Sequence, residues 1–297
     1  MELRQLQYLV AVADEASFTR AAARARVAQP GVSAQIRRLE RELGQPLLDR
    51  SGGTVRVTEA GAAVLPYARA ALAAVAAVRD TVDALTGLAR GHVTVGVVGS
   101  VSSPGLDLPG LLATFHAGHP GVEITVTEAG TSALTGALRD GRLDVALIAA
   151  GPPLPAGLAA ADIVDEPLVI AVSHGDALAG RTGISLGAIR DRVLISLPPG
   201  TGLRTCLDDA CLAMGFRPRI GFEVGDPQLV AQLAGRGLGV ALLPASVTRA
   251  HAGRVRAIPL TRPRLRGRIA LAWRTSQAPS PAARAFIEHA RGQLTRG

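Results

Sequence analysis

The chain has 297 residues, of which 48% are hydrophobic, so it is long and apolar enough for two or three globular domains. Its 32 basic residues are all arginine and face 24 acidic residues, which gives a formal net charge of +8. This composition excludes a disordered chain. Arginine suits bidentate contacts with phosphate and guanine, although the lack of lysine and asparagine is also typical of a GC-rich bacterial genome.

Neither a signal peptide nor a membrane span is expected. The first ten residues lack a basic start followed by an apolar core. The apolar stretches 64–78 and 229–248 are interrupted by Pro66, Arg69 and Arg236. We therefore expect a soluble, cytoplasmic protein without a membrane partner.

The N-terminal segment predicts three short helices. Residues 2–13 carry apolar side chains on one face. Ser17 is expected to cap a second helix, on which Phe18, Ala21 and Ala22 recur at helical spacing. A third helix is predicted over 28–43 and ends at Gly44 as a C-cap.

The third helix has two distinct faces when its residues are placed about 100° apart. A core-facing stripe consists of Val32, Ile36, Leu39 and Leu43. A second stripe, which contains no carboxylate, consists of Gln29, Ser33 and Arg37, with Pro30, Ala34 and Arg41 beside it. Glutamine can pair with adenine and arginine with guanine, so we interpret residues 28–43 as the recognition helix of a helix-turn-helix. On spacing alone, the alternative is a solvated face on an alanine-rich helical pair.

A hairpin and a long helix follow the third helix. Residues 47–58 are predicted to form a hairpin with Gly52 and Gly53 at its tip. A helix is then predicted from Thr58 to about Leu88. A helix this long cannot bury its apolar stripe against the small N-terminal domain, so pairing with a second copy is expected. The stripe consists of Val64, Leu65, Ala68, Leu72, Val75, Val78, Val82 and Leu85.

From His92 onward the pattern changes to alternating strands and helices, which predicts parallel sheets covered by helices. The predicted strands lie at 92–98, 122–130, 144–149, 167–173, 193–197, 219–224, 239–244 and 268–274. The predicted helices lie in the later part of 105–117 and at 131–139, 203–214, 227–235 and 281–294.

The run from Phe18 to Gly61 resembles the N-terminal signature of LysR-type transcriptional regulators, through FTRAA, QPGVSAQIRRLE, ELGQPLLDR and VTEAG in that order. The resemblance implies an α/β protein with an N-terminal winged helix-turn-helix, a long linker helix and a two-lobed effector domain like that of periplasmic binding proteins. The implied domains are 1–58 for DNA binding, 59–90 for the linker and dimerisation helix, and 91–297 for the effector domain. Lobe I would comprise 92–163 and 267–297, and lobe II 164–266.

The resemblance also assigns roles to residues of the DNA-binding domain. Bases are expected to be contacted by Gln29, Pro30, Ser33 and Arg37, and phosphates by Arg38, Arg41, Arg50 and Arg56. For Arg50 and Arg56, the alternative is a solvated surface charge. Two positions depart from the family pattern, because Ala28 replaces a capping serine and Ala34 replaces an arginine found in many members. Loss of the cap should cost the recognition helix about 1 kcal/mol.

An effector is expected in the cleft between the lobes, at loops that join strands to helices. The loops 99–103 and 198–204 offer hydroxyl and backbone N–H groups that suit an anion, so a small anionic metabolite is predicted. Ordinary helix capping is the alternative role for these side chains. The predicted contacts are Ser100, Ser102, Thr131, Thr201 and Asp226.

The sequence leaves the roles of two further features open. Residues 249–274 hold eight arginines and no acid; we favour a solvated loop or a subunit contact over electrostatic steering of DNA. Cys206 and Cys211 lie five residues apart on one predicted helix, beyond disulfide reach, and structural packing is expected for both. In peroxide-sensing members of the family, the reactive cysteine aligns with Gly202.

The expected function is that of a sequence-specific regulator that binds an inverted repeat of double-stranded DNA as a dimer or tetramer, with RNA polymerase as a further partner. The alternative is a solute-binding sensor that acts through protein partners without reading DNA. An enzyme is not expected, because the chain lacks a G-x-S-x-G motif, a P-loop and a G-x-G-x-x-G motif. No cofactor is expected, and His116 and His119 alone do not suggest a metal site.

Overall fold

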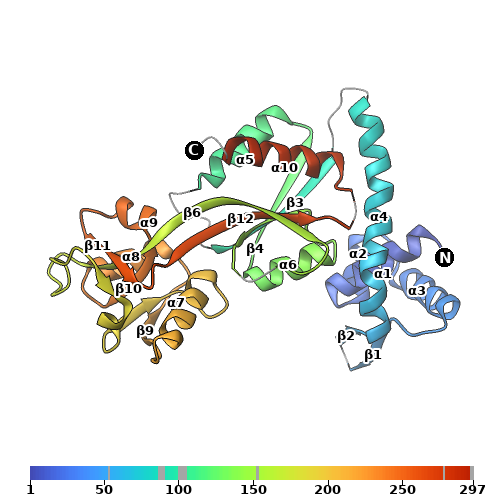
Figure 1. Cartoon of the computed structure of the whole chain (residues 1–297). Coiled ribbons are helices and arrows are strands. Elements are labelled where there is room, and N and C mark those ends of the chain that lie inside the picture. The colour runs from blue at the N-terminus through green and yellow to red at the C-terminus, as the bar shows by residue number, and fades with distance from the viewer. Residues whose placement is uncertain (53, 86–90, 100–105, 152–153, 277, 295–297) are drawn as a thin grey trace.

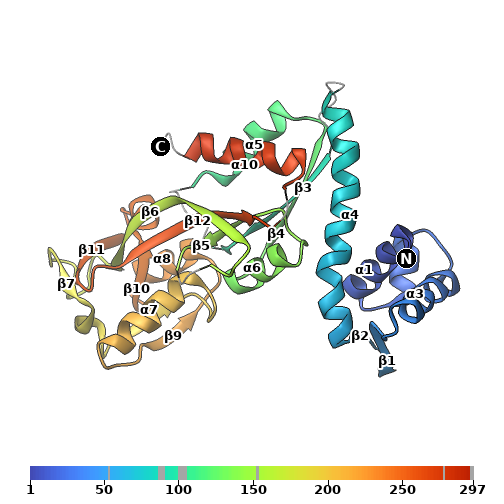
Figure 2. The ribbon, with the colours of Figure 1, turned by 45° about the vertical axis from the view of Figure 1, so that its right-hand side comes forward.

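The computed structural model describes all residues except 53, 86–90, 100–105, 152–153, 277 and 295–297. A small N-terminal domain is followed by a long helix and by two α/β lobes that share one continuous sheet (Figure 1). A turned view shows the long helix standing between the N-terminal domain and the lobes (Figure 2).

The N-terminal domain contains helices α1 (Leu3–Glu15), α2 (Phe18–Arg24) and α3 (Gln29–Leu43) and an antiparallel hairpin of β1 (Leu48–Gly52) and β2 (Thr54–Val57). Ser17 caps α2 as predicted, because its hydroxyl accepts a hydrogen bond from the Arg20 N–H at 3.3 Å. Gly44 ends α3 with a φ of 70°, a left-handed conformation that glycine adopts without strain. The fully buried core residues include Leu9, Val12, Val32, Ile36 and Leu39.

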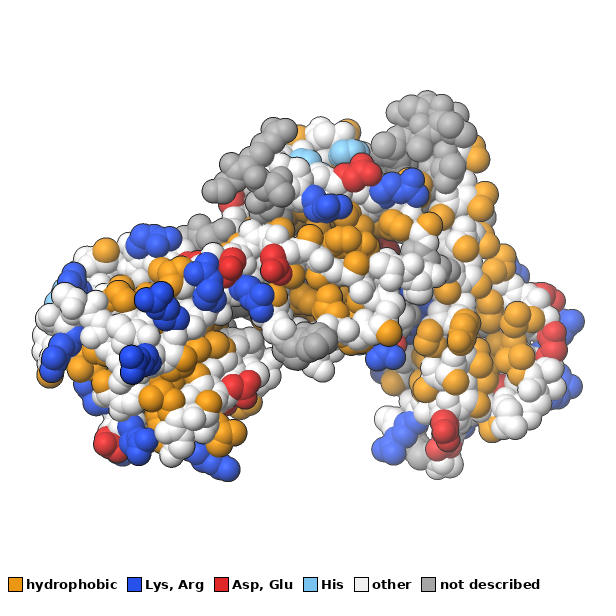
Figure 3. Space-filling view, viewed as in Figure 1, with side chains coloured by type: hydrophobic (Ala, Val, Ile, Leu, Met, Phe, Trp, Pro, Cys, Tyr) orange, Lys and Arg blue, Asp and Glu red, His pale blue; other side chains and the backbone are white. Residues whose placement is uncertain are grey.

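Helix α4 (Glu59–Leu85) divides its apolar stripe between two environments. The first half packs on the N-terminal domain through Leu65, Ala68 and Leu72, and Arg69 forms an ion pair of 2.6 Å with Asp14 of α1. The small domain therefore buries the first half of the stripe, and the expectation that it cannot bury the whole stripe holds for the second half. The second half exposes Val75, Val78 and Val82, and apolar side chains follow the length of the helix in Figure 3.

Lobe I contains the parallel strands β3 (Gly91–Val97), β4 (Val122–Glu128) and β5 (Val145–Ala149). Its helices are α5 (Leu108–Gly118), α6 (Thr131–Arg139) and α10 (Pro281–Leu294). Helices α5 and α10 meet through Phe115 and Phe286, which are fully buried and whose rings pack edge to face with centroids 5.0 Å apart. The C-terminal helix is therefore part of the lobe I core.

Lobe II repeats this plan with the parallel strands β8 (Val193–Ser196), β9 (Arg219–Glu223) and β10 (Val240–Pro244). Its helices are α7 (Gly202–Ala213), α8 (Pro227–Gly235) and α9 (Ala245–Ala250), with a short 3-10 helix at Leu186–Ile189. Strand β11 (Val255–Arg262) lies beside the short strand β7 (Ile184–Ser185).

Two long strands connect the lobes. Strand β6 (Leu158–Ser173) pairs with β12 (Arg266–Arg274) over residues 158–167, and then with β10 and β11 over 168–173. The sequence predicted only the second part of β6. The expected boundary at 163/164 falls inside this continuous strand, so no loop separates the lobes there.

The interpretation of residues 249–274 as a solvated loop was also wrong. Most of this stretch lies in β11 and β12, and both strands pair with β6. Four of its strand arginines are exposed because side chains alternate between the two faces of a strand, namely Arg256, Arg262, Arg266 and Arg268. Arg274, near the end of the stretch, is half-buried.

Candidate functional site

The outer face of α3 presents Gln29, Pro30 and Arg37 to solvent, opposite the buried stripe of the same helix. The helix begins without a side-chain cap, because Ala28 offers no hydroxyl. Pro30 is tolerated in the first turn, where a backbone N–H has no helical partner. The sequence prediction of an exposed polar stripe therefore holds for these three residues.

Ser33 lies differently from its neighbours on that stripe, because it is only 7% exposed. Its hydroxyl accepts a hydrogen bond of 3.0 Å from Arg37, and its carbonyl accepts a second one of 3.4 Å from the Arg37 Nε. The structure thus places Ser33 beneath Arg37, where it restrains the guanidinium of the longer side chain.

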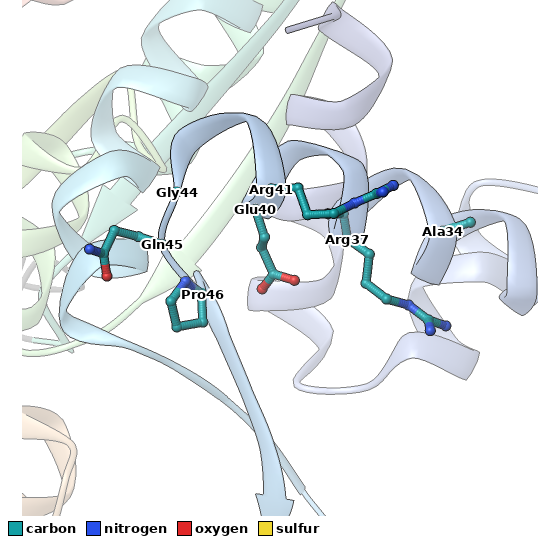
Figure 4. Close-up of a pocket in the computed structure, with 7 residues that line it drawn as sticks. All are labelled: Ala34, Arg37, Glu40, Arg41, Gly44, Gln45 and Pro46. Carbon is teal, nitrogen blue, oxygen red and sulfur yellow. The ribbon is translucent and has the colours of Figure 1, made fainter.

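A solvent-open depression of about 740 Å³ lies between α3 and the base of the hairpin. In Figure 4, Arg37 and Arg41 extend outward from α3, whereas Glu40 turns toward Pro46. Gln45, which the sequence analysis did not select, also lines the depression. The arrangement provides two guanidinium groups on the rim of a concave surface, which suits contact with a phosphate backbone.

Glu40 ties the hairpin to α3. One of its carboxylate oxygens accepts the backbone N–H groups of Leu47 and Leu48 at 3.0 and 3.2 Å. The other pairs with Arg50 at 2.9 Å, and the Arg50 guanidinium lies 4.9 Å from the centroid of the Phe18 ring. Arg50 is therefore held between α2 and α3, and its guanidinium already has an anionic partner.

The remaining predicted phosphate contacts, Arg38 and Arg56, are exposed. Arg38 lies 3.6 Å from the exposed carboxylate of Glu2. Arg56 is opposite Asp49 across the hairpin. The pKa of Asp49 is lowered, first because Ser51 donates its backbone N–H and its hydroxyl and to a smaller extent because Arg56 is near.

A second site lies between the two lobes, where a cavity of about 1300 Å³ borders the β6–β12 ribbon. Helix α6 of lobe I and helix α7 of lobe II both contribute N-terminal residues to its walls. The first turns of both helices carry backbone N–H groups without a helical partner, so these ends favour negative charge.

The predicted effector contacts are placed unequally around this cavity. Thr131 lines it and accepts the backbone N–H of Ala149 at 3.3 Å. Thr201 is outside the lining, although Gly200 and Gly202 belong to it, because the threonine hydroxyl donates to the Pro198 carbonyl at 2.8 Å.

Asp226 is also outside the cavity lining. It caps α8 by accepting the Gln228 N–H at 2.9 Å, the capping role considered as the alternative for it. Ser100 and Ser102 lie outside the described residues.

Charged side chains of the ribbon line the cavity, namely Asp162, Glu166, Arg266 and Arg268. Figure 3 shows acidic and basic side chains close together over the middle of the molecule. Arg268 is 3.8 Å from Asp162, a loose ion pair between exposed groups. Glu166 is fully engaged, because Ser246 donates its N–H and its hydroxyl to it at 2.8 and 2.7 Å. Arg268 is therefore the arginine of the cavity that can most easily exchange its acidic partner for a ligand.

Sequence reasoning missed these ribbon residues as site residues. The signal was present as arginine at every second position, Arg266 and Arg268, which is the period of side chains on one face of a strand. Only the pairing of β12 with β6 brings Arg266 and Arg268 into diagonal ion pairs with Asp165 and Asp162.

Both cysteines are free, and both thiols are shifted toward the protonated form. Cys206 lines the cavity, and burial, followed by the nearby charge of Asp209, raises its pKa. Cys211 is buried, and burial, followed by Asp208, raises its pKa to about 11. A raised pKa lowers the thiolate fraction at neutral pH, which is the opposite of what a reactive thiol needs.

The lobes touch where α7 begins. A Cβ added to Gly202 would lie 2.3 Å from the Cβ of Ala149 at the end of β5, and one added to Gly130 would lie 3.4 Å from the Gly200 carbonyl. Glycine at position 202 is therefore required for this close approach. A cysteine at this position cannot fit this arrangement of the lobes.

Gly202→Ala should lower the thermal stability of the effector domain or separate its lobes. The added methyl group overlaps Ala149, and this overlap must outweigh the gain of roughly 0.5–1 kcal/mol that alanine brings within a helix. Differential scanning calorimetry and small-angle scattering would measure both effects. Gly136→Ala is the matched control, because no atom lies within 4 Å of its new Cβ; it should be stabilising. Equal melting temperatures for the two variants would contradict the contact.

Comparison with known proteins identifies both parts of the chain. The family model for the bacterial regulatory helix-turn-helix protein of the LysR family matches residues 3–62, and the model for the LysR substrate binding domain matches residues 86–295. The chain is 32% identical over 292 residues to the uncharacterized HTH-type transcriptional regulator YnfL of Escherichia coli, covering 97% of both proteins. The chain belongs to the LysR family of transcriptional regulators.

Solved structures of LysR-type regulators share its whole architecture. A full-length OxyR variant from Pseudomonas aeruginosa has a TM-score of 0.79 at 28% identity and covers 99% of this chain and 94% of its own. Full-length CbnR in complex with its target DNA has a TM-score of 0.62 at 27% identity and covers 98% and 99%. These similarities establish a DNA-binding transcriptional regulator with an effector-binding domain.

One segment of this LysR-type regulator is apolar enough to raise the question of a membrane. Residues Glu59–Val78 of α4 have the length and composition of a membrane-crossing helix. The same segment is tied to the DNA-binding domain by the Arg69–Asp14 ion pair and by the buried Ala68. Part of its apolar surface therefore packs on the DNA-binding domain, whereas Val75 and Val78 at its end are exposed.

Proposed function

We propose that two copies of this chain pair through the exposed half of α4 and bind an inverted repeat of double-stranded DNA with two α3 helices. The exposed stripe of Val75, Val78 and Val82 supports the pairing, because apolar residues at this spacing form helix–helix seams. A two-fold dimer presents two recognition helices to two half-sites. Tetramer formation and contact with RNA polymerase are further parts of this proposal.

Base recognition is proposed for Gln29, Pro30 and Arg37, with Ser33 holding Arg37 in place. The observation that carries the proposal is the exposed face of α3, whose charged groups lie opposite a fully buried stripe. Phosphate contacts are proposed for Arg38, Arg41 and Arg56. For Arg50 we propose a smaller share, because Glu40 neutralises its charge.

Arg37→Ala should weaken binding to the cognate site by about 1–3 kcal/mol and relax the sequence preference, because it removes a bidentate base contact. Arg56→Ala is the matched control, with the same loss of charge. It should weaken binding to all sequences about equally and lower the salt dependence by about one counterion. Titrations of cognate and scrambled DNA at several salt concentrations separate the two outcomes, and identical behaviour of both variants would refute the division of roles.

The DNA site can be found by incubating the full-length protein with fragmented genomic DNA and sequencing the retained fragments. An enriched inverted repeat supports the proposal, and the genomic positions of the retained fragments identify the neighbouring genes. Retention without any shared sequence, lost at moderate salt, contradicts it and favours the alternative of a solute sensor that acts through protein partners.

For the effector, we propose a small anionic metabolite in the interlobe cavity, held by Arg268 and by the first turns of α6 and α7. The loose pairing of Arg268 with Asp162 supports this, because a ligand carboxylate can approach Arg268 more closely than Asp162 does and replace it. A thermal-shift screen of small carboxylates tests it, with Arg268→Gln expected to abolish the response. Equal shifts in both proteins would contradict the role of Arg268.

A further inference from the structure

A separate cavity of about 330 Å³ lies between the linker helix and lobe I. Its volume is at the lower end of small-molecule sites, which span roughly 300–1,000 Å³. It shares no lining residue with the interlobe cavity. One wall is formed by α4 with Ala73, Ala74, Ala77 and Val78, and the other by Asp144, Trp273, Arg274, Ala278, Pro279 and Ser280.

Arg274 is the unusual residue of this cavity. Its Nε is buried without a hydrogen-bond partner, and within the described part of the chain no hydrogen bond or ion pair reaches its guanidinium. The guanidinium lies against the backbone of Gly141, where a Cβ would approach it to 2.6 Å. Removing a cation from water without an anionic partner costs free energy. An anion bound beside Arg274 would therefore stabilise this arrangement.

The nearby acids are already engaged. One carboxylate oxygen of Asp144 accepts the backbone N–H and the hydroxyl of Thr94 at 2.8 and 2.7 Å. Asp140 pairs with Arg142 at 2.8 Å. Neither acid lies within ion-pair distance of Arg274, so none of the acids that the structure describes around the cavity supplies its counter-ion.

The other walls of the cavity indicate which chemical groups the anion has besides its negative charge. Alanine side chains leave room along α4, and Trp273 offers a half-buried aromatic ring, over which Arg291 lies at 5.9 Å. Arginine binds carboxylates in a planar, bidentate manner, and an indole ring favours a flat apolar group.

We propose that this cavity is a second ligand site, which binds a small monocarboxylate with a flat apolar body. The carboxylate pairs with Arg274, and the apolar body lies between Trp273 and the alanines of α4. Because one wall belongs to the linker helix and the other to lobe I, occupancy fixes the position of the effector domain against the helix that carries the DNA-binding domain. The site therefore acts directly on the junction between DNA binding and effector sensing.

Trp273 is the only tryptophan of the chain, so its fluorescence reports on this site alone. The full-length protein should show a saturable fluorescence change with phenylacetate and none with the neutral phenylacetamide. Arg274→Gln should weaken the apparent affinity for phenylacetate at least tenfold. Arg268→Gln, in the interlobe cavity, should leave it unchanged, which separates this site from the proposed effector site.

A second variant tests the same site without relying on the correct folding of Arg274→Gln. Ala74→Leu fills the cavity from the α4 side and should also abolish the fluorescence change. A change that is equal for acid and amide, or one that persists in Arg274→Gln and Ala74→Leu, overturns the proposal. So does the absence of any saturable response in the unmodified protein.

Discussion

Val82→Glu should leave the protein monomeric and weaken its binding to the cognate inverted repeat by a hundredfold or more. Val82 is 55% exposed in a single chain and lies one heptad after Val75 on the second half of α4. A carboxylate at this position would be buried without a partner in a helix–helix seam. Loss of the dimer removes the second half-site, and bivalent binding exceeds binding of one unit by about 10²–10⁴.

The measurement combines analytical ultracentrifugation with titration of a two-site and a one-site DNA duplex. Val82→Glu should bind both duplexes alike, because only one DNA-binding domain engages. Ala76→Glu is the matched control, since Ala76 is exposed on α4 but lies about 120° away from Val82 around the helix. If Val82→Glu remains dimeric with full affinity, α4 does not form the seam.

Glu40→Ala should destabilise the DNA-binding domain by about 2–4 kcal/mol, because it leaves two backbone N–H groups and one guanidinium without their acceptor. The Glu40 side chain is only 14% exposed and connects α3 with the first residues of the hairpin. DNA affinity should fall together with stability, since the hairpin and Arg50 lose their fixed position relative to α3.

Glu42→Ala provides the control for this change. Glu42 lies two residues further along α3, is exposed, and pairs with the N-terminal amino group. The variant has the same change in net charge and should retain nearly full stability, because an exposed ion pair contributes about 0–1 kcal/mol. Chemical denaturation of both variants decides the question. Equal midpoints would show that Glu40 acts only through its charge.

The relation between the two ends of the molecule depends on α4. Its first half is part of the core of the DNA-binding domain, and its second half borders lobe I through Ala73, Ala77 and Val78. We expect a change in the position of lobe I to reach α3 through this helix. This direct path gives an effector a route to the spacing of the two recognition helices of a dimer.

The local elements of this protein were determined by the sequence itself. Helical periodicity alone predicted α3 with its buried stripe of Val32, Ile36 and Leu39, and Ser17 and Gly44 marked helix ends with the geometry expected of them. Strand and helix alternation predicted most of the effector domain, because the periods of 2.0 and 3.6 residues are properties of the backbone. The motifs from Phe18 to Gly61 gave the family, which the comparisons confirmed.

The tertiary structure alone decided which of these side chains meet. Ser33 belongs to the polar stripe by spacing, yet packing buries it beneath Arg37. Arg268 appeared to belong to a charged loop, and only the register between β12 and β6 places it beside Asp162 in the interlobe cavity. Gly202 approaches Ala149, which lies 53 positions earlier in the chain, and Arg274 forms no ion pair with any acid that the structure describes. Periodicity assigns each residue to a face of its own element, whereas a site depends on contacts between elements far apart in the chain, which are fixed by packing and strand register.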